Sequence, residues 1–212
     1  MALPLVDVLI FPAPQAFDLA DAGNPANLSL NATTAPIFKN IAGSGSIFYG
    51  VGVKDPMTGY IFATFDNGGN HPKAAIASLI AHLKPTRSCH VQFSSDTFKT
   101  AFKTPITEVL VLIMIEPDNR EKAVQLLSKI AEASGGVLSF APDTDDENTF
   151  VIFGGWESVE AHMNAYNDLP EGSKTDLRQL FSLAKIVYPP EAPPAYAKLQ
   201  RYEPLQYVKK TD

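Results

Sequence analysis

Residues 37–62, IFKNIAGSGSIFYGVGVKDPMTGYIF, match residues 127–152, LSKIAEASGGVLSFAPDTDDENTFVI, when the first stretch is moved forward by 90 positions without a gap. Between the identical residues, apolar pairs follow the same order of helix, glycine turn, strand, acidic turn and strand. Because a fixed internal period determines architecture, the match predicts two fused copies of one small α+β unit. The identical pairs are Lys39 and Lys129, Ser44 and Ser134, Gly45 and Gly135, and Asp55 and Asp145.

Each copy reads in the order β-α-β-β-α-β, judged from apolar periodicity and turn residues. That order gives a four-stranded antiparallel sheet with both helices on one face, so the predicted fold class is α+β with two tandem ferredoxin-like repeats. In the first copy we expect strands at 5–11, 46–53, 59–66 and 89–93, with helices at 33–42 and from Pro72. In the second we expect strands at 107–116, 137–141, 149–156 and 184–188, with helices at 119–133, near 158 and at 174–183.

The predicted elements divide the chain into three segments. The Pro-rich stretch 189–194 is expected to leave the domain, and the residues after it could wrap back across it. Asp118 and Glu121 have the spacing of a capping box for the helix that follows them. The segments are a first repeat at 1–100, a second repeat at 101–190 and a C-terminal tail at 191–212.

Composition favours a globular protein that handles a small molecule. The chain has 212 residues, 45% of them hydrophobic, and a net charge of -6. This acidic balance argues against a nucleic-acid or anionic-membrane partner, which would need clustered Lys and Arg. A single cysteine, Cys89, excludes a disulfide framework. The longest apolar run, Val109 to Ile115, is too short to span a bilayer, and 1–7 lacks a basic signal region, so we expect a cytoplasmic protein.

The second copy resembles a known family. The segment Gly154-Gly155-Trp156 followed by Glu157-Ser158-Val159-Glu160-Ala161-His162 is similar to the Trp-x-Ser-x-Glu-Ala segment of dimeric α+β barrels of the antibiotic-biosynthesis-monooxygenase type. The resemblance covers about 107–166. It implies that two ferredoxin-like sheets pair into a barrel, here within one chain, and that a cavity between a sheet and its helices binds a flat hydrophobic molecule. Relatives include cofactor-free oxygenases, polyketide cyclases and haem-degrading proteins.

One departure from the family pattern bears on cofactors. Haem-binding and many cyclase relatives carry a histidine nine or ten residues after the tryptophan, where this chain has Ala165 and Tyr166. Haem needs an axial ligand at a defined place, so we expect no haem. The sequence also lacks the glycine-rich loops of nucleotide-binding folds and a histidine pair at i, i+4. We therefore expect no cofactor and no metal.

Two candidate catalytic pairs follow from the sequence. His162 shares a helical stripe with Tyr166, and a histidine there could act as a base because its ordinary pKa lies near neutral. Asp7 interrupts an apolar strand. A buried carboxylate there must be paired with another group, be protonated or line a water-filled cavity. His90 is the candidate partner of Asp7. The alternative for His162 is a packed core histidine, and for Asp7 a solvent-open strand position.

Four further residues are candidates for substrate binding. Trp156, at the end of its strand, could be a stacking wall for a planar ligand, and Asp66 is its counterpart when the copies are aligned without a gap. Tyr49 or Tyr60, together with His90, would suit an aromatic substrate. Core packing is the alternative for the aromatic residues, and helix capping is the alternative for Asp66.

These features lead to a functional hypothesis. The chain is predicted to be a cofactor-independent enzyme of small-molecule, or secondary, metabolism that removes a proton from a hydrophobic, aromatic or polyketide-like substrate in a monooxygenase-type reaction. A cyclase, isomerase or dehydratase on the same fold, or a protein that only binds a small ligand, are the alternatives. The chain would be a monomeric pseudo-dimer or a homodimer.

Overall fold

The first half of the chain folds in the predicted order of strands and helices. The computed structural model describes residues 3–13, 34, 36–42, 45–65, 71–188 and 195–202. The strands of this half are β1 (Leu5–Pro12), β2 (Ser46–Gly52), β3 (Thr58–Phe65) and β4 (Arg87–Gln92), and its helical segments are 36–42 and α2 (Lys73–Leu83).

The second half repeats this order after a short connecting helix, α3 (Phe98–Ala101). The strands are β5 (Ile106–Met114), β6 (Leu138–Pro142), β7 (Thr149–Trp156) and β8 (Ala184–Tyr188). The helices are the 3₁₀ helix η2 (Pro117–Asn119), α4 (Arg120–Ala133), α5 (Val159–Asn167) and α6 (Glu171–Leu183). A further strand, β9 (Ala195–Arg201), follows all the others in the chain.

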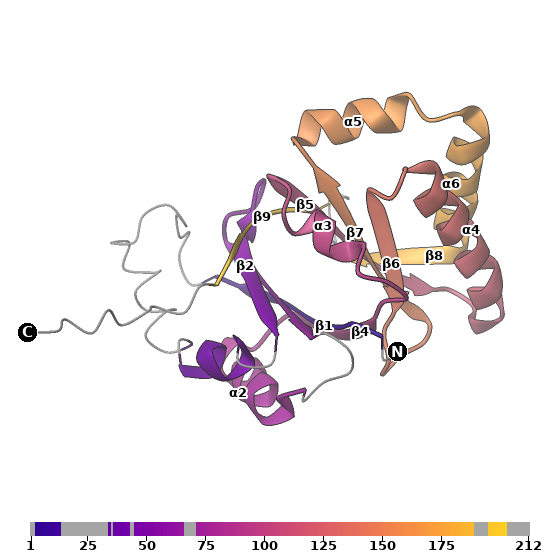
Figure 1. Cartoon of the computed structure of the whole chain (residues 1–212). Helices are drawn as coiled ribbons and strands as arrows, with labels where there is room; N and C mark the ends of the chain where they lie inside the picture. Colours follow the sequence, from indigo (N-terminus) through magenta and orange to yellow (C-terminus); the bar gives the residue numbers. More distant parts are fainter. Residues whose placement is uncertain are drawn as a thin grey trace, which may run out of the picture.

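Both halves have the same strand order, β4-β1-β3-β2 in the first and β8-β5-β7-β6 in the second (Figure 1). Together with β9 they form one nine-stranded, largely antiparallel sheet that curls into a nearly closed barrel. The free edges meet where Val91, in β4, makes an isolated bridge to Asp143, and where the Thr144 N–H donates to the His90 carbonyl at 2.7 Å. The predicted fold class, two ferredoxin-like repeats in an intrachain barrel, is confirmed.

Strand β9 joins the two halves. It pairs antiparallel with β2 on one side and with the first part of β5 on the other. The approach to β2 is close, because a Cβ on Gly50 would lie 1.9 Å from the Lys198 carbonyl oxygen. The tail prediction did not foresee this strand, since the Pro-rich stretch 189–194, which lies outside the described residues, suggested a departure from the domain.

Hydrophobic side chains fill the barrel and both sheet–helix layers. The interior core contains Phe62 from the first half, Phe153 from the second and Phe102, which follows α3. A second core packs 36–42 and α2 on the first sheet, and a third packs α4 and α6 on the second. In Figure 1 α2 lies at the bottom and α4 and α6 lie at the right, so the helical layers cover different outer faces of the barrel.

One local prediction was wrong. The capping box of Asp118 and Glu121 does not form, because Pro117 starts a 3₁₀ turn and Asn119 precedes α4 without a side-chain cap. Phe98 and Ala101 of α3, the helix that connects the halves, are buried in the barrel. The limits of the predicted repeats remain a prediction. Among the described helices, none combines the length and the apolar character needed to cross a membrane.

Candidate functional site

Two buried carboxylates occupy equivalent places in the two halves. Asp7 is the third residue of β1 and Glu108 the third residue of β5. They are only 4% and 6% exposed. Asp7 alternates with Leu9, and Glu108 with Leu110, so both carboxylates lie on the helix-facing side of their sheets. A buried carboxylate is costly unless it is paired or neutral, so the partners of each decide what it can do.

Glu108 is held by an indole and an imidazole. The Trp156 Nε1–H, at the end of β7, donates to Glu108 Oε2 at 2.8 Å. His162 Nε2 lies 3.6 Å from the same oxygen. The position of His162 follows from the start of α5, where the Ser158 hydroxyl caps the helix by accepting from the Ala161 N–H at 3.0 Å.

The other nitrogen of His162 meets β9. Its Nδ1 lies 2.6 Å from the hydroxyl of Tyr196, which is the cross-strand neighbour of Glu108. The imidazole also packs against Trp156, with ring centroids 4.4 Å apart. Glu108, His162 and Tyr196 therefore lie in a row of titratable groups, with a hydrogen bond between His162 and Tyr196 and a longer contact of 3.6 Å between His162 and Glu108. We call these residues, with Trp156, the second-half site.

Burial sets the protonation states of this site. Desolvation raises the pKa of Glu108 to about 7, although the Trp156 N–H favours the carboxylate. Desolvation lowers the pKa of His162 and, with the nearby charge of Glu108, raises the pKa of Tyr196 to about 12. A carboxyl group that titrates near neutral pH is suited to general acid–base catalysis, because it can both accept and return a proton there.

The raised pKa of Glu108 predicts a specific pH dependence of stability. Between its ordinary pKa of 4.5 and about 7, the folded chain holds a proton on Glu108 that the unfolded chain has lost. The free energy of unfolding therefore falls as pH rises through this window, by about 3 kcal/mol in total from this group. Urea denaturation at pH 5 and pH 8 should show most of this loss in the wild type and a much smaller loss in Glu108→Gln.

Titration of His162 does not account for the expected difference in stability between the wild type and Glu108→Gln. Its lowered pKa has the opposite sign, adding stability as pH rises toward 6.5, and it is present in both proteins. Trp156 and Tyr196 also face Glu108, and Trp156 does not titrate. The Lys54 Nζ atom lies over the ring of Tyr196, 5.4 Å from its centroid. Equal losses of stability in the wild type and Glu108→Gln would contradict a raised pKa at this carboxyl.

The first-half site consists of Asp7, His71 and His90. His71 Nε2 lies 2.7 Å from Asp7 Oδ2, and His90 Nδ1 lies 2.5 Å from Asp7 Oδ1. Asp7 and His90 are direct cross-strand neighbours on β1 and β4. The hydrogen bond and charge of Asp7 raise the pKa of His90 in spite of its partial burial. The predicted pair of Asp7 with His90 is thus brought together, with His71 as a third member.

The two sites follow one plan. Phe65 and Trp156 end the third strand of their halves, and each lies opposite a residue two places before the carboxylate. A histidine follows each aromatic residue by six positions, His71 and His162, and packs on its ring. The strand register therefore matches Trp156 with Phe65, one residue before the gapless alignment. Asp66 itself lies outside the described residues.

Other predicted site residues lie apart from these groups. Tyr166 is 44% exposed, and the hydroxyl that reaches His162 belongs to Tyr196. Tyr60 is buried in the barrel interior, where its hydroxyl meets that of Tyr188. Tyr49 accepts a hydrogen bond from Gln200 at 2.6 Å. The described contacts thus bring neither Tyr49 nor Tyr60 to His90.

Sequence reasoning missed Glu108, His71 and Tyr196. Glu108 carries the same signal as Asp7, a carboxylate at the start of an otherwise apolar strand. His71 directly precedes Pro72, where a helix was predicted to begin. Tyr196 belongs to the tail, for which no strand was predicted, so nothing in the sequence placed it opposite Glu108.

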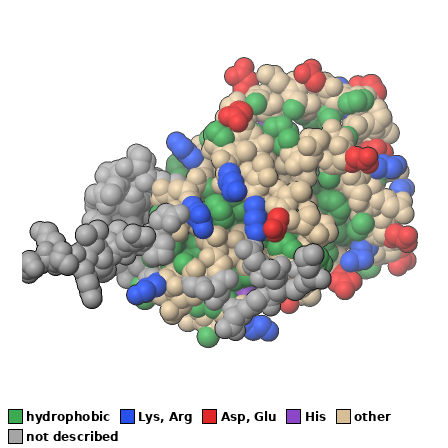
Figure 2. Space-filling view, in the orientation of Figure 1, with side chains coloured by type: hydrophobic (Ala, Val, Ile, Leu, Met, Phe, Trp, Pro, Cys, Tyr) green, Lys and Arg blue, Asp and Glu red, His purple; other side chains and the backbone are tan. Residues whose placement is uncertain are grey.

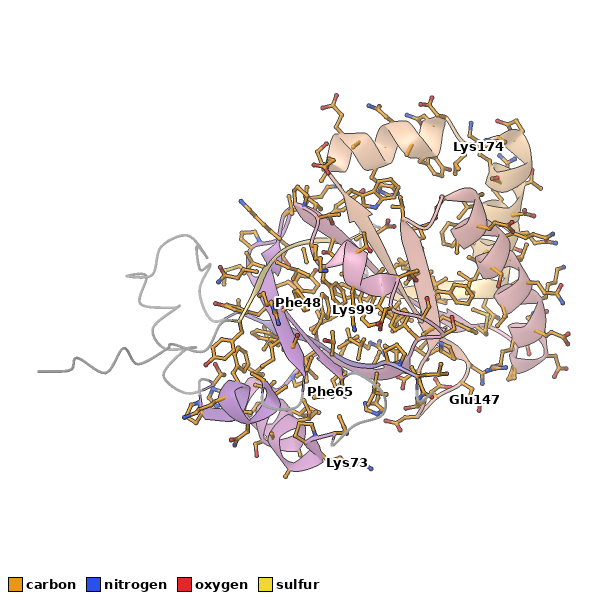
Figure 3. All side chains as sticks on the ribbon, in the orientation of Figure 1. Phe48, Phe65, Lys73, Lys99, Glu147 and Lys174 are labelled. Atoms are coloured by element: carbon orange, nitrogen blue, oxygen red, sulfur yellow. The ribbon has the colours of Figure 1, made fainter. Side chains whose placement is uncertain are left out.

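A cavity of about 390 Å³ opens at one end of the barrel. Its wall combines Phe48 and Phe102 with cationic side chains, and Figure 2 shows Lys and Arg gathered over α3 on this face. In Figure 3 Phe48 and Lys99 lie on the α3 side of the first sheet, whereas Phe65 lies toward α2. The lining residues are Ser46, Phe48, Thr64, Lys99, Phe102, Lys103, Leu199, Gln200 and Arg201. None of them belongs to either carboxylate–histidine site.

Comparison with known proteins places the fold. No family model and no curated protein matches the sequence. A candidate monooxygenase from Fusobacterium nucleatum aligns over 95% of this chain and 94% of its own, with 13% identity and a TM-score of 0.56. An anthrone oxidase-like protein aligns over 96% and 94%, with 12% identity and a TM-score of 0.55. A chlorite dismutase variant from Candidatus Nitrospira defluvii aligns over 94% and 91%, with 11% identity and a TM-score of 0.55. The chain therefore shares the α+β barrel fold of these structures.

The cavity at the barrel end does not fit haem. An axial ligand in haem proteins is His, Cys, Met or Tyr. The residues that line this cavity in the described part of the chain include none of these types.

Proposed function

We propose that the chain is an enzyme of small-molecule metabolism that removes a proton from a hydrophobic, aromatic substrate without a cofactor, in a monooxygenase-type reaction. The observation that carries this proposal is the buried carboxyl of Glu108. Its pKa is raised to about 7, and it lies 3.6 Å from the imidazole of His162. Strongly perturbed titratable groups in contact with one another are typical of functional sites. The fold that the chain shares with monooxygenase-like proteins supports the same reading.

The second-half site suits deprotonation of a weakly acidic C–H or O–H group. Above about pH 7 the Glu108 carboxylate can take a proton, and the neutral imidazole of His162 lies 3.6 Å away, where a small shift brings it within hydrogen-bond distance. Tyr196 extends the path by a hydrogen bond to the other imidazole nitrogen. The burial of Glu108 keeps the carboxylate poorly solvated, and a poorly solvated base is a stronger one.

Helix α5 offers the apolar surface that a hydrophobic substrate would cover. None of its residues is buried, and Figure 1 shows it at the upper edge of the molecule after the end of β7. Met163 and Tyr166 lie one and four positions after His162 and are 46% and 44% exposed. Side chains three and four apart share a helix face, so this surface adjoins the imidazole. Exposed apolar surface of this kind often marks a binding site.

The reaction can proceed with oxygen as the sole oxidant. Deprotonation of a ring-flanked CH₂ group gives a resonance-stabilised carbanion and leaves the proton on Glu108. Addition of O₂ and return of that proton give a hydroperoxide, which loses water to leave a carbonyl: CH₂ + O₂ becomes C=O + H₂O. The name of one structural neighbour, anthrone oxidase-like protein, is compatible with a substrate of this type.

The proposal is tested with anthrone as the probe substrate. The purified, chelator-treated chain should consume one O₂ for each carbonyl formed, with no flavin, nicotinamide or metal added, and ¹⁸O₂ should label the product carbonyl. Conversion of a polyketide probe at an unchanged rate under nitrogen would favour the cyclase or isomerase alternative. Saturable binding with no product would favour a ligand-binding protein.

A further inference from the structure

The first-half site contains the elements of a metal centre. We infer that Asp7, His71 and His90 bind one divalent first-row transition-metal ion. Their candidate ligand atoms, a carboxylate oxygen and two ring nitrogens, lie within 4.8 Å of one another. Two histidines and one carboxylate hold zinc in hydrolytic enzymes and iron in non-haem oxygenases, and both arrangements leave coordination positions open.

The distances between the ligand atoms suit an ion after a small adjustment. Bonds from such ions to nitrogen and oxygen measure about 2.0–2.2 Å, so neighbouring ligand atoms lie about 3 Å apart. The present nitrogen–oxygen contacts of 2.7 Å for His71 and 2.5 Å for His90 are slightly shorter. The three ligand atoms together spread over up to 4.8 Å, so they must rearrange by about 1–2 Å to surround one ion. His71 and His90 have side chains that are 15% and 25% exposed, so solvent reaches the site.

Comparison with the second-half site shows why only the first half is suited to a metal. There, Glu108 Oε2 accepts a hydrogen bond from the Trp156 N–H, and an indole N–H does not give up its proton to a metal ion. The cross-strand partner of Glu108 is Tyr196. In the first half Phe65 replaces the indole and His90 replaces the tyrosine. Both differences favour a cation, because one removes a fixed donor from the carboxylate's surroundings and the other adds an imidazole nitrogen.

Surrounding residues fix the positions of the proposed ligands, as is usual for metal ligands. Asp7 and His90 are fixed opposite each other by the β1–β4 register. The backbone of His90 is tied to the turn after β6, since its N–H donates to Asp143 Oδ1 at 3.3 Å and its carbonyl accepts from the Thr144 N–H at 2.7 Å. The second half of the chain thus supports the ligand geometry of the first.

Cobalt titration tests the inference. The full chain, stripped with a chelator, is titrated with Co²⁺ and followed by d–d absorption. We expect one Co²⁺ per chain and its displacement by Zn²⁺, which binds such sites more tightly. His71→Ala and His90→Ala should each weaken Co²⁺ binding at least about 100-fold, since each removes a direct ligand and even second-layer changes weaken binding about 10- to 100-fold. His162→Ala, the matched control in the other half, should bind Co²⁺ like the wild type.

Loss of Co²⁺ binding must be distinguished from loss of folding and from loss of the proposed catalytic activity. Circular dichroism checks each variant, and His71→Asn, at the partly exposed ligand next to α2, serves if an alanine variant unfolds. Less than one bound Co²⁺ in the wild type, or unchanged affinity in folded His71→Asn, would overturn the assignment. An equal loss in His162→Ala would also overturn it. Because no substrate is present, failure here leaves the proposal for Glu108 and His162 untouched.

Discussion

Glu108→Gln is expected to lower kcat for substrate deprotonation by about 100- to 10,000-fold, the usual contribution of a general base. Glutamine has the same shape and can still accept from the Trp156 N–H, yet it cannot take a proton. The wild-type kcat/KM, which reports ionisation of the free enzyme, should rise with pH up to about 7 and then level off, as Glu108 ionises. In Glu108→Gln this rise should disappear. Steady-state kinetics from pH 5 to 9 measure both effects.

The control for this prediction is Glu157→Gln. Glu157 follows Trp156 directly but is exposed, so the variant carries the same change of charge and should keep wild-type kcat. The hydrogen bond from Trp156 allows a second check, because indole fluorescence should report an intact site in Glu108→Gln. A folded Glu108→Gln with more than about a tenth of wild-type kcat would exclude Glu108 as the base.

Phe153→Ala is expected to lower the free energy of unfolding by about 3–5 kcal/mol. Phe153 is fully buried, and its ring lies 5.1 Å from that of Phe62 and 4.9 Å from that of Phe102, measured between centroids. Truncation leaves a cavity between the two halves and removes aromatic contacts from both. Urea denaturation followed by circular dichroism gives the change.

The matched control is Phe181→Ala on α6, where the side chain is 41% exposed. It should change the free energy of unfolding by no more than about 0.5 kcal/mol. Because Phe153 joins the halves, both should unfold in one transition in the wild type. A Phe153→Ala protein as stable as Phe181→Ala would mean that the interior of the barrel does not hold the halves together.

The duplication was visible in the sequence because its markers are local. Glycine turns, acidic turns and strand periodicity depend on neighbouring residues, so the order of strands and helices could be read in both copies. Strand β9 could not be read this way, because its pairing with β2 and β5 is long-range and a Pro-rich stretch precedes it. The burial of α3 likewise depends on the closed barrel, which no short window of sequence reveals.

The candidate site was predicted in part for the same reason. Asp7 and His162 stand out locally, as a carboxylate in an apolar strand and a histidine on an apolar helical stripe. Their partners come from far along the chain: His71 is 64 positions from Asp7, and Tyr196 is 34 positions from His162. The expectation of no metal rested on the absence of a local histidine spacing, whereas the proposed ligands converge from β1, β4 and the start of α2.

The position of β9 in the sheet has a consequence for biosynthesis. Translation runs from the N-terminus, and β9 is the last of the described strands to leave the ribosome. Until it does, the edge of β2 and the first part of β5, Thr107 to Val109, stay unpaired, and such edges invite association between chains. Tyr196 arrives with β9, so a nascent chain would lack the end of the proton path as well. Cotranslational chaperones that shield open strand edges should therefore matter more for this protein than for one whose sheet closes early.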